Sequence, residues 1–512
     1  MKNKIWIILA VIAIVAAVAL GVMFAGKNGE VADLNTKVNE LTKQVEDAKA
    51  SANDEVKALQ AKVDELTAQL AAAQEEIVKL LYGEPEIDPA TGEVYDLGGA
   101  TVTIYDYWSG DGARAAEPTE EQQAQYDYRD WLMETYNVVI EQKQGGDWGT
   151  CAEEMINFVS APDGSYRAYI IEPGKVGSLV ANGVAAPVKY DFSAEKWNQA
   201  TINAWSIAGN VYGVSTGNSE PRGCLYFNKR ILEEANINWE EIYDMQAAGT
   251  WTWAAWEELL KKTTLDTDND GVIDIYGVSG SGDDMYVLAT FGNGGTFFDF
   301  DAEGKLQPTM NSEATVEALN WGKTIQANYW KHTPVDENGV AANWDWYKQA
   351  WKQGEFAFYV YQTYGGYNDN SEMADMEDEW GCVAFPVPNE GDQYIHVASE
   401  NTTLIPNVYT EEEVSKIMFI IDMWTNPTPG YDDEFAWIGN KYNYTDDRAV
   451  DETYAMLREG KAGRDNKVVY LGTQNDILGN SLLWGLAGGD VASLIEAGMP
   501  AWQAACDTFN AK

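Results

Sequence analysis

The sequence predicts an α/β body that stands outside a cell on a transmembrane helix and a coiled-coil stalk, and three observations carry this prediction. Residues 1–26 contain an uncharged apolar run, an apolar heptad pattern follows it, and strand and helix patterns then alternate to the end of the chain. The 512 residues are too many for one hydrophobic core, so we expect the body to contain more than one domain.

The apolar run from Ile5 to Phe24 is long enough to cross a membrane, since a hydrocarbon core of about 30 Å needs about 20 apolar residues in a helix. Lys2 and Lys4 precede the run, so the positive-inside bias leaves the N-terminus in the cytoplasm and the rest of the chain outside. A cleaved signal peptide is the alternative, because residues 17–19 have the small-x-small form of a cleavage site. We favour an uncleaved anchor over residues 1–26, because the apolar run continues beyond that site.

Residues 27–82 have the spacing of a coiled coil, which predicts a stalk that associates with a second copy. Apolar or small residues follow one another mainly at intervals of three and four, at Val31, Leu34, Val38, Leu41, Val45, Ala48, Ala52, Val56, Leu59, Val63, Leu66, Leu70, Ala73, Ile77 and Leu80. A helix over these residues spans about 75 Å. The alternative is a single helix, either solvated or folded back on the body. Residues 83–98, with their Gly and Pro, are the expected linker.

The composition favours a neutral ligand that presents sugar rings. Asp and Glu number 81 against 34 Lys and Arg, which gives a formal net charge of -47. Such a charge repels phosphate backbones, so it argues against a nucleic-acid partner and also disfavours an acidic ligand. The chain has 20 Trp and 28 Tyr, and the flat face of a pyranose stacks well on aromatic rings.

The four cysteines are Cys151, Cys224, Cys382 and Cys506, and they are too scattered to form a zinc site. An extracellular location permits disulfides, but the spacing identifies no pairing. Cys224 lies in an apolar, strand-like stretch and is expected to be a buried free thiol.

Strand and helix patterns alternate in the body, which predicts a parallel sheet with helices on its faces. The expected strands are residues 101–105, 138–141, 168–171 and 381–385, and the expected helices are 120–136, 147–160, 253–262, 312–327 and 411–424. Thr252 is the expected N-cap of the third helix, and Thr410 with Glu413 forms a capping box for the last. Ligands bind beyond the carboxyl ends of such strands, which directs attention to residues 108–111 and 172–174.

The body resembles the family 1 extracellular solute-binding proteins of ABC importers, of the maltose- and oligosaccharide-binding type. The resemblance runs from about residue 99 to the end and rests on several individually weak segments. They are Gly209–Val214 with Leu225–Lys229, Thr250–Trp253 with Trp256, Gly292–Gly295, Trp351–Tyr359 (which resembles the family's F-x-x-G-x-x-A-M segment), Phe385–Pro388, and Val491–Phe509.

The resemblance implies a two-lobed, periplasmic-binding-protein-like (type II) fold whose lobes close on a sugar by a hinge motion. Residues 99–222 with about 386–440 are expected to form lobe 1, and residues 223–385 with about 441–512 to form lobe 2. It further implies an extracellular protein, with no enzymatic activity, that delivers a carbohydrate to the permease of an ABC importer. The many aromatic residues favour an oligosaccharide, and the excess of acidic residues favours a neutral one.

One departure from the family bears on how the protein is held at the cell surface. Relatives from Gram-positive cells usually carry a lipid-bearing Cys after a small-residue box, but Lys27 stands in that position here. The apolar helix must therefore serve as the anchor, and the body is expected on the extracellular side of a single-pass cell-membrane protein.

An acidic loop follows the expected helix 253–262 and predicts a structural Ca²⁺ site. Carboxylates at positions 1, 3, 5 and 9, a Gly at position 6 and a backbone carbonyl at position 7 follow the EF-hand loop, and the expected ligands are Asp266, Asp268, Asp270, Val272 and Asp274. Gly277 stands at position 12, where an EF-hand has a bidentate Glu. A solvated acidic turn is the alternative.

The candidate ligand-binding residues of the cleft come from strand ends, from the segments between the lobes and from segments where the family presents aromatic platforms. They are Trp108, Asp111, Glu172, Glu220, Arg222, Tyr361, Tyr364, Glu400, Asn401 and Trp484. Trp344 and Trp346 are expected to form an aromatic cluster with Tyr347. Core packing is the alternative for each aromatic residue, and it is least favoured for Trp108 and Trp484.

Three other functions fit parts of the sequence less well. A glycoside hydrolase needs two carboxylates about 5–9 Å apart, and a chain with 81 acidic residues offers no specific signal for such a pair. A surface adhesin or scaffold would use the coiled coil as its main element, and a sugar sensor would pass lobe closure to a signalling partner.

Overall fold

The computed structural model describes residues 40, 54–88, 91–207, 209–366, 373, 376–397, 400–431, 444, 446–458, 463–464 and 481–511. The predicted membrane anchor, residues 1–26, lies outside these residues and stays a prediction. Within the described ranges, no helix is both long enough and apolar enough to cross a membrane.

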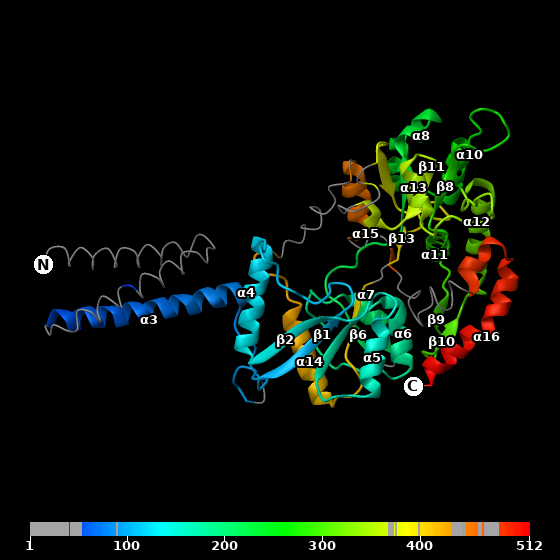
Figure 1. The fold of residues 1–512 in the computed structure, drawn as a ribbon. Helices are drawn as coiled ribbons and strands as arrows, with labels where there is room; N and C mark the ends of the chain where they lie inside the picture. Colours follow the sequence, from blue (N-terminus) through cyan, green and yellow to red (C-terminus); the bar gives the residue numbers. More distant parts are fainter. Residues whose placement is uncertain are drawn as a thin grey trace. The chain divides into compact units, whose positions relative to one another are not determined.

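The chain forms two compact units, and the smaller one, here called the stalk unit, extends to Tyr95 and includes Thr119–Trp131 and Thr428–Tyr431. Its helix α3 (Asp54–Tyr82) is continuous over 29 residues (Figure 1). The ring of Tyr82 lies 4.9 Å from that of Trp131 and 5.5 Å from that of Tyr128. The second half of the predicted stalk is therefore helical, whereas its association with a second copy stays a prediction.

The larger unit, here called the body, contains two separate sheets, and the first sheet defines lobe 1. Its strand order is β2 (Val138–Gln144), β1 (Ala100–Asp106), β3 (Tyr166–Ile171), β14 (Thr402–Leu404) and β6 (Gly213–Val214). β1 pairs in parallel with β2 and β3, as the alternating pattern predicts, because helices connect these strands. β14 returns from far along the chain and pairs antiparallel with β3 and β6.

Of the helices of lobe 1, residues 411–424 form a helix as the sequence predicts, whereas the predicted helix 147–160 begins only at Cys151. Residues 147–150 instead form a turn in which Asp147 accepts hydrogen bonds from the amides of Gly149 and Thr150. Both α5 (Cys151–Ser160) and α14 (Glu411–Trp424) pack against β3, and α5 also packs against α6 (Pro173–Ala181). The predicted capping box of α14 is present, since Thr410 and Glu413 exchange hydrogen bonds at its first turn. The other elements of this lobe are α7 (Gln199–Ala204) and the pair β4 (Ser206–Ile207) and β5 (Asn210–Val211). Most of α4 (Glu120–Thr135) belongs to the stalk unit.

The second sheet defines lobe 2, and its strand order is β12 (Trp380–Val383), β7 (Cys224–Asn228), β11 (Phe356–Tyr361) and β8 (Tyr276–Gly280). Every residue of β7, β11 and β12 is buried, as expected for strands covered on both faces. The surrounding helices are α8 (Lys229–Glu234), α9 (Glu240–Ala248), α10 (Trp253–Thr263), α11 (Gly282–Gly292), α12 (Glu313–Tyr329), α13 (Trp346–Lys352), α15 (Ala455–Arg458) and α16 (Val491–Asn510). The remaining elements are β9 (Phe298–Phe300) with β10 (Leu306–Pro308), β13 (Ile395–His396) with β15 (Gly463–Arg464), η1 (Thr363–Gly366), η3 (Ala449–Tyr454) and η6 (Trp484–Ala487).

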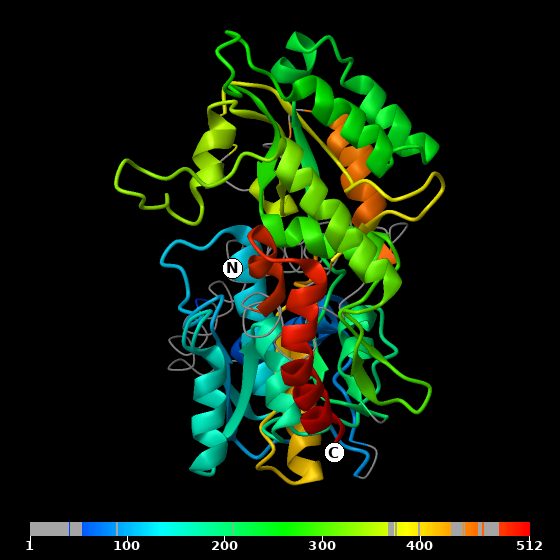
Figure 2. The ribbon, with the colours of Figure 1, turned by 90° about the vertical axis from the view of Figure 1, so that its right-hand side faces the viewer.

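Two chain segments connect the lobes, residues 215–223 between β6 and β7 and residues 384–401 between β12 and β14. They pair through Arg222 and Val397, whose backbone amides and carbonyls exchange hydrogen bonds of 2.9 and 3.1 Å. The long helix α16, red in Figure 2, contacts α6 of lobe 1 as well as α12 and β10. Each connection follows a strand of one sheet and leads into a strand of the other.

All four cysteines are buried free thiols, including Cys224 in β7. Burial raises the pKa of the Cys506 thiol to about 12, so this side chain stays protonated at neutral pH.

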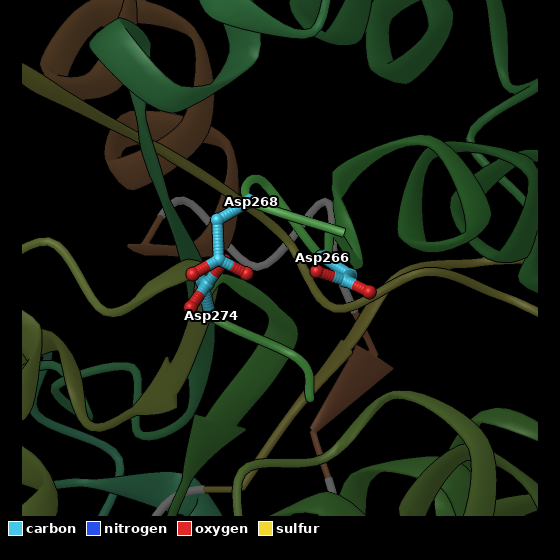
Figure 3. A group of neighbouring side chains, drawn as sticks. All are labelled: Asp266, Asp268 and Asp274. Carbon is cyan, nitrogen blue, oxygen red and sulfur yellow. The ribbon is translucent and has the colours of Figure 1, made fainter. Parts of the chain in front are cut away.

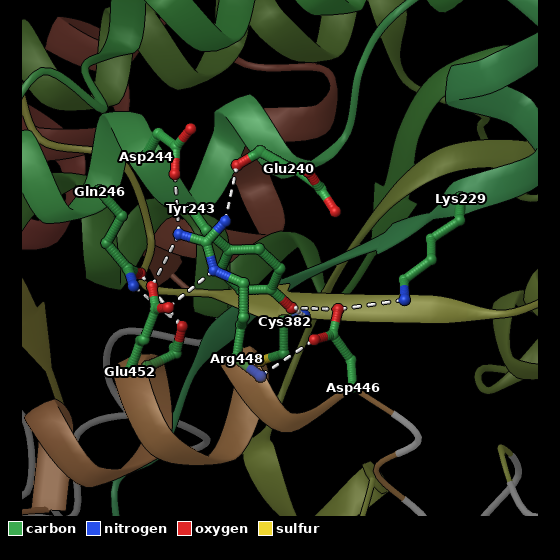
Figure 4. A network of polar contacts seen from close by, with 10 residues as sticks. Lys229, Glu240, Tyr243, Asp244, Gln246, Cys382, Asp446, Arg448 and Glu452 are labelled. Atoms are coloured by element: carbon green, nitrogen blue, oxygen red, sulfur yellow. Dashed lines mark hydrogen bonds and ion pairs between the residues drawn. The ribbon is translucent and has the colours of Figure 1, made fainter.

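A buried ion pair fastens the segment of residues 446–458 to lobe 2 (Figure 4). The carboxylate of Asp446 lies 3.1 Å from the ammonium of Lys229 and accepts a hydrogen bond of 3.0 Å from the hydroxyl of Tyr243. Near the surface, the guanidinium of Arg448 binds Glu452 and Asp244. The side chains of Asp446 and Lys229 are only 6% and 8% exposed, so each charge depends on the other for compensation.

We predict that Asp446→Ala lowers the free energy of unfolding by about 3–5 kcal/mol, because it leaves the buried charge of Lys229 uncompensated. Urea denaturation at pH 7 measures the loss. The matched control is Glu379→Ala, which removes a second carboxylate that lies 3.7 Å from the same ammonium but is 74% exposed. This control is expected to change the free energy by less than about 0.5 kcal/mol, and equal losses in the two variants would contradict the prediction.

Candidate ligand-binding cleft

A cavity of about 1380 Å³ lies in the body and is lined by residues from both lobes and from both connecting segments. Lobe 1 contributes the ends of β1 and β3, and lobe 2 contributes the end of β8, the start of α11 and the residues that follow β11. Binding sites in α/β sheets are expected beyond the carboxyl ends of strands, and the cavity occupies this position for both sheets.

Four exposed tryptophans line this cleft. Trp108 and Trp148 follow strands of lobe 1, whereas Trp344 and Trp484 belong to segments that pack with lobe 2. Their side chains are 74%, 51%, 73% and 54% exposed, respectively. A soluble protein rarely leaves rings of this size in water without a ligand or partner for them, so their gathering around one cavity marks it as a binding site.

Two aspartates, the buried Asp106 and the exposed Asp147, fix the backbone turns that carry the two tryptophans of lobe 1. Asp106, 4% exposed at the end of β1, accepts hydrogen bonds of 2.8 and 3.0 Å from the backbone amides of Trp108 and Ser109. In the same way Asp147 accepts hydrogen bonds from the two amides that follow Trp148. Each tryptophan therefore projects from a turn whose backbone is fixed.

The tryptophans of lobe 2 sit on short helical segments or beside them. Trp484 begins η6, which is anchored by the buried side chains of Leu482, Leu483 and Leu486. The ammonium of Lys323 on α12 donates hydrogen bonds of 2.6 and 2.7 Å to the carbonyls of Leu486 and Gly489. Trp344 precedes α13, and the expected contact of Trp346 with Tyr347 is present at 6.2 Å between ring centroids.

Polar groups of lobe 1 meet in the cleft close to Trp108. The hydroxyl of Tyr107 donates a hydrogen bond of 2.5 Å to the side-chain oxygen of Asn401. Glu172 caps α6 by accepting a hydrogen bond of 3.0 Å from the amide of Gly174. Burial, and then the charge of Glu172, raise the pKa of the Tyr107 hydroxyl, which therefore stays a hydrogen-bond donor at neutral pH.

Arg222 projects into the cleft from the first connecting segment. Its guanidinium donates a hydrogen bond of 3.4 Å to the side-chain oxygen of Gln362 and lies 5.7 Å from the ring centre of Tyr364. The hydroxyls of Tyr361 and Tyr364 are 2.9 Å apart. The structure thus brings Trp108, Glu172, Arg222, Tyr361, Tyr364, Glu400, Asn401 and Trp484, from the residues nominated on sequence grounds, to the lining of one cavity.

Two nominated residues, Asp111 and Glu220, are outside the described lining of the cleft. Asp111 is exposed, and its carboxylate accepts a hydrogen bond of 3.1 Å from the amide of Ala113. The carboxylate of Glu220 instead binds the guanidinium of Arg458 and the hydroxyl of Tyr454. Its backbone amide donates a hydrogen bond of 3.0 Å to Glu400, so Glu220 joins the connecting segments rather than facing a ligand.

The structure also places residues in the cleft that the sequence analysis did not nominate. They include Asp106, Tyr107, Trp148, Asp283, Asp284, Trp330, His332 and Gln362. Asp283 and Asp284 follow directly after β8, so the strand-end argument would have found them had this strand been recognised. Its short sequence, YGVSG, contains two glycines and gives a weak strand signal.

The acidic loop between α10 and β8 brings three of its four carboxylates together (Figure 3). One ligand oxygen from each of Asp266, Asp268 and Asp274 lies within 4.8 Å of the others. Asp270 is outside this group, and its carboxylate accepts a hydrogen bond of 2.8 Å from the amide of Val272. Hard oxygen ligands in this arrangement are the chemistry that Ca²⁺ prefers, and the residues present therefore fit the ion.

A family model described as bacterial extracellular solute-binding protein matches residues 110–413, which is more than half of the chain. The chain belongs to this family. The resemblance drawn from the sequence is thereby confirmed. Because the family consists of binding proteins, it agrees with the expectation of a protein without enzymatic activity.

Several solved structures share the fold of this solute-binding protein. A cyclo/maltodextrin-binding protein complexed with maltotetraose is 11% identical, with a TM-score of 0.52 over 80% of this chain and 96% of that one. The cyclic α-maltosyl-1,6-maltose binding protein of Arthrobacter globiformis is 17% identical, with a TM-score of 0.51 over 80% and 99%. UgpB of Mycobacterium tuberculosis, in complex with glycerophosphocholine, is 14% identical, with a TM-score of 0.52 over 79% and 98%. A search of curated protein sequences found no match.

Proposed function

We propose that this solute-binding protein captures a neutral oligosaccharide between its lobes and delivers it unchanged to the permease of an ABC importer. The observation that supports the proposal most strongly is the set of four exposed tryptophans around one cavity of about 1380 Å³. Rings that approach a ligand from both lobes suit a chain of several sugar units, whose apolar faces stack on them. Two of the solved structures with the same fold are named as oligosaccharide-binding proteins.

The charge of the cleft supports a neutral ligand over an acidic one. Its described lining contains five carboxylates, from Asp106, Glu172, Asp283, Asp284 and Glu400. Arg222 is the single Arg or Lys in that described lining. An anionic glycan would therefore enter a field of its own sign, whereas the hydroxyls of a neutral glycan can donate hydrogen bonds to the carboxylates.

The way in which the lobes are connected supports capture of the ligand by closure of the two lobes. The two connecting segments are paired at Arg222 and Val397, so rotation of one lobe moves both segments together. Closure around a glycan would bring Trp108 and Trp148 toward Trp344 and Trp484 and would exclude water from the rings. In this proposal the permease reads the closed state, and no bond of the glycan is made or broken.

We predict that Trp108→Ala and Trp484→Ala each weaken glycan binding about tenfold, which corresponds to about 1.4 kcal/mol of lost stacking. Isothermal titration calorimetry with a panel of neutral di- to hexasaccharides, including maltotetraose, measures the effect. Tyr431→Ala is the control, because this aromatic side chain is 40% exposed and is not among the described residues of the cleft.

Two outcomes would contradict glycan capture by lobe closure, and a third would contradict release of the glycan unchanged. The first is that the unmodified protein gives no heat of binding in calorimetry with any neutral glycan of the panel. The other is a small-angle scattering profile that does not change at saturating glycan, which would favour an adhesin or a scaffold because such a protein needs no lobe closure. Release of new reducing ends during incubation would favour a hydrolase instead.

We further propose that residues 5–24 anchor the chain in the cell membrane and that the stalk pairs two copies of it. The apolar heptads support the second part, and α3 provides a continuous helix over their second half. On this helix Leu66 is buried, and Val63, Leu70 and Ile77 are partly buried.

We predict that deletion of residues 5–24 releases the chain from the membrane fraction of expressing cells, because a helix of about 20 apolar residues is what holds it there. Immunoblots of membrane and soluble fractions measure the release.

We predict that the released chain is a dimer in analytical ultracentrifugation. The double substitution Leu66→Asp with Leu70→Asp is expected to convert the dimer to a monomer, because charges in the apolar seam of a coiled coil oppose pairing. Lys62→Ala with Glu65→Ala, an exposed pair on the same helix, is the control. A monomer before any seam substitution would contradict the pairing.

We also propose that the loop of Asp266, Asp268 and Asp274 holds a structural Ca²⁺ ion, with Asp270 and the carbonyl of Val272 as the further ligands that the EF-hand pattern names. Position 12 of the pattern is Gly277, so the affinity is expected to be low.

We predict that millimolar Ca²⁺ raises the Tm of the protein by a few degrees, because an ion that binds only the folded state stabilises it. Differential scanning calorimetry with Ca²⁺ and with EDTA measures the shift. Asp268→Asn is expected to abolish it. Asp301→Asn is the control, since Asp301 lies in another acidic turn, where its carboxylate accepts backbone hydrogen bonds from Glu303 and Lys305. The same Tm in Ca²⁺ and EDTA for the unmodified protein would exclude the site.

A further inference from the structure

Glu220 lies at the point where the first connecting segment passes from lobe 1 to lobe 2. Ser219, directly before it, is fully buried, and its hydroxyl accepts a hydrogen bond of 3.0 Å from the side-chain amide of Asn198 in lobe 1. The carbonyl of Pro221, directly after it, accepts a hydrogen bond from the hydroxyl of Thr363, which follows β11 of lobe 2. The chain is thus held by a different lobe on either side of Glu220.

The backbone and the side chain of Glu220 bind opposite sides of the paired connecting segments, here called the pivot. The backbone amide donates a hydrogen bond of 3.0 Å to the carboxylate of Glu400, which lies two residues before β14 of lobe 1. The carboxylate of Glu220 accepts hydrogen bonds from the guanidinium of Arg458 and from the hydroxyl of Tyr454.

Arg458 and Tyr454 belong to a segment that is fastened to lobe 2. The buried ion pair of Asp446 holds the start of this segment (Figure 4). Farther along, Gln246 of α9 donates a hydrogen bond of 2.9 Å to the hydroxyl of Thr453. The partners of the Glu220 carboxylate therefore move with lobe 2, and the contact between them crosses the pivot.

This contact lies outside the cleft. Arg222 and Glu400 of the same pivot are among the described lining residues, whereas Glu220, Arg458 and Tyr454 are not. The side chains of Arg458 and Glu220 are 16% and 30% exposed, so solvent screens their charges only in part. When two lobes rotate toward each other about a pivot, groups on the cleft side approach and groups on the far side separate.

We propose that the contact of Glu220 with Arg458 and Tyr454 is a latch on the side of the pivot away from the cleft, and that it holds the lobes apart in the absence of a ligand. The proposal rests on the proposed function and deepens it, because it gives these positioning residues control over how readily the lobes close. A ligand must supply the free energy that breaks the latch, which lowers its apparent affinity. Loss of the latch therefore populates the closed state and tightens binding.

A first experiment measures the distance between the lobes without any ligand. Spin labels are attached at Ala113→Cys in lobe 1 and Ala342→Cys in lobe 2, two exposed positions within a few residues of cleft tryptophans, and the four native cysteines are buried. Pulsed EPR spectroscopy is expected to find an additional, shorter distance when Glu220→Gln or Arg458→Gln is introduced. The same distances with and without these substitutions would overturn the proposal.

A second experiment measures affinity by isothermal titration calorimetry, with maltotetraose as the probe. Glu220→Gln and Arg458→Gln are each expected to lower the Kd about fivefold, which is at the low end of couplings between distant sites. A damaged fold or a lost ligand contact would raise the Kd, so a lower Kd distinguishes a latch from a merely structural contact. An unchanged or higher Kd in both variants would overturn the proposal.

Two further variants make the test specific to this contact. The double variant Glu220→Gln with Arg458→Gln is expected to have the same Kd as either single variant, because both substitutions remove one contact, and additive effects would overturn the latch. Glu452→Gln is the matched control, since this carboxylate binds the guanidinium of Arg448 in the same segment without crossing the pivot. It is expected to change neither the distance between the lobes nor the Kd.

The distance between the lobes is measured without a ligand, so the two experiments separate this inference from the proposed function. If the variants gain the shorter distance and no glycan of the panel binds, the assignment of a glycan ligand fails while the latch stands. If glycans bind and the variants match the unmodified protein in distance and Kd, the latch fails while the glycan assignment stands. Thermal melting verifies that each variant is folded, and Tyr454→Phe provides a milder variant should the others be unstable.

Discussion

Two backbone hydrogen bonds between Arg222 and Val397 join the segments that connect the lobes, and the geometry of the cleft depends on them. Because the first segment also carries Glu220 and the second carries Glu400, which bind each other, the two connections form one pivot rather than two independent linkers. The side chain of Glu220 extends this pivot to Tyr454 and Arg458. A cleft between two lobes keeps a defined width only if such a pivot limits how the lobes move.

The cleft combines two surfaces that make different demands on a ligand. The exposed rings offer large apolar faces on which a flat ring of a ligand can stack. The polar wall of Asp106, Tyr107, Glu172, Asn401 and the two aspartates at the start of α11 presents carboxylates and hydrogen-bonding groups, which contact a ligand only in particular directions. Arg222 lies in the first connecting segment and lines the cleft. Its positive charge acts on the carboxyl groups of both Asp284 and Glu400.

The sequence alone was sufficient for most of the fold, since the signals concerned are local. The strands 101–105, 138–141 and 168–171, the Thr252 N-cap and the capping box of Thr410 and Glu413 all depend on residues a few positions apart. Trp108 and Glu172 were found in the same way, because they follow strands with strong apolar patterns. The start of α11 was missed, since β8 is a short strand with two glycines whose position is fixed by pairing with β11.

What the sequence by itself determined is therefore the family, the order of elements and the supply of aromatic and acidic side chains. Only the tertiary structure decided which of them share a cavity. Glu220 and Arg222 are two residues apart and looked alike as candidates, yet one binds Arg458 and the other faces the cleft. The physical reason is that strand ends and connecting segments distant in the chain meet through packing and backbone pairing. Nothing in the local spacing of residues specifies those contacts.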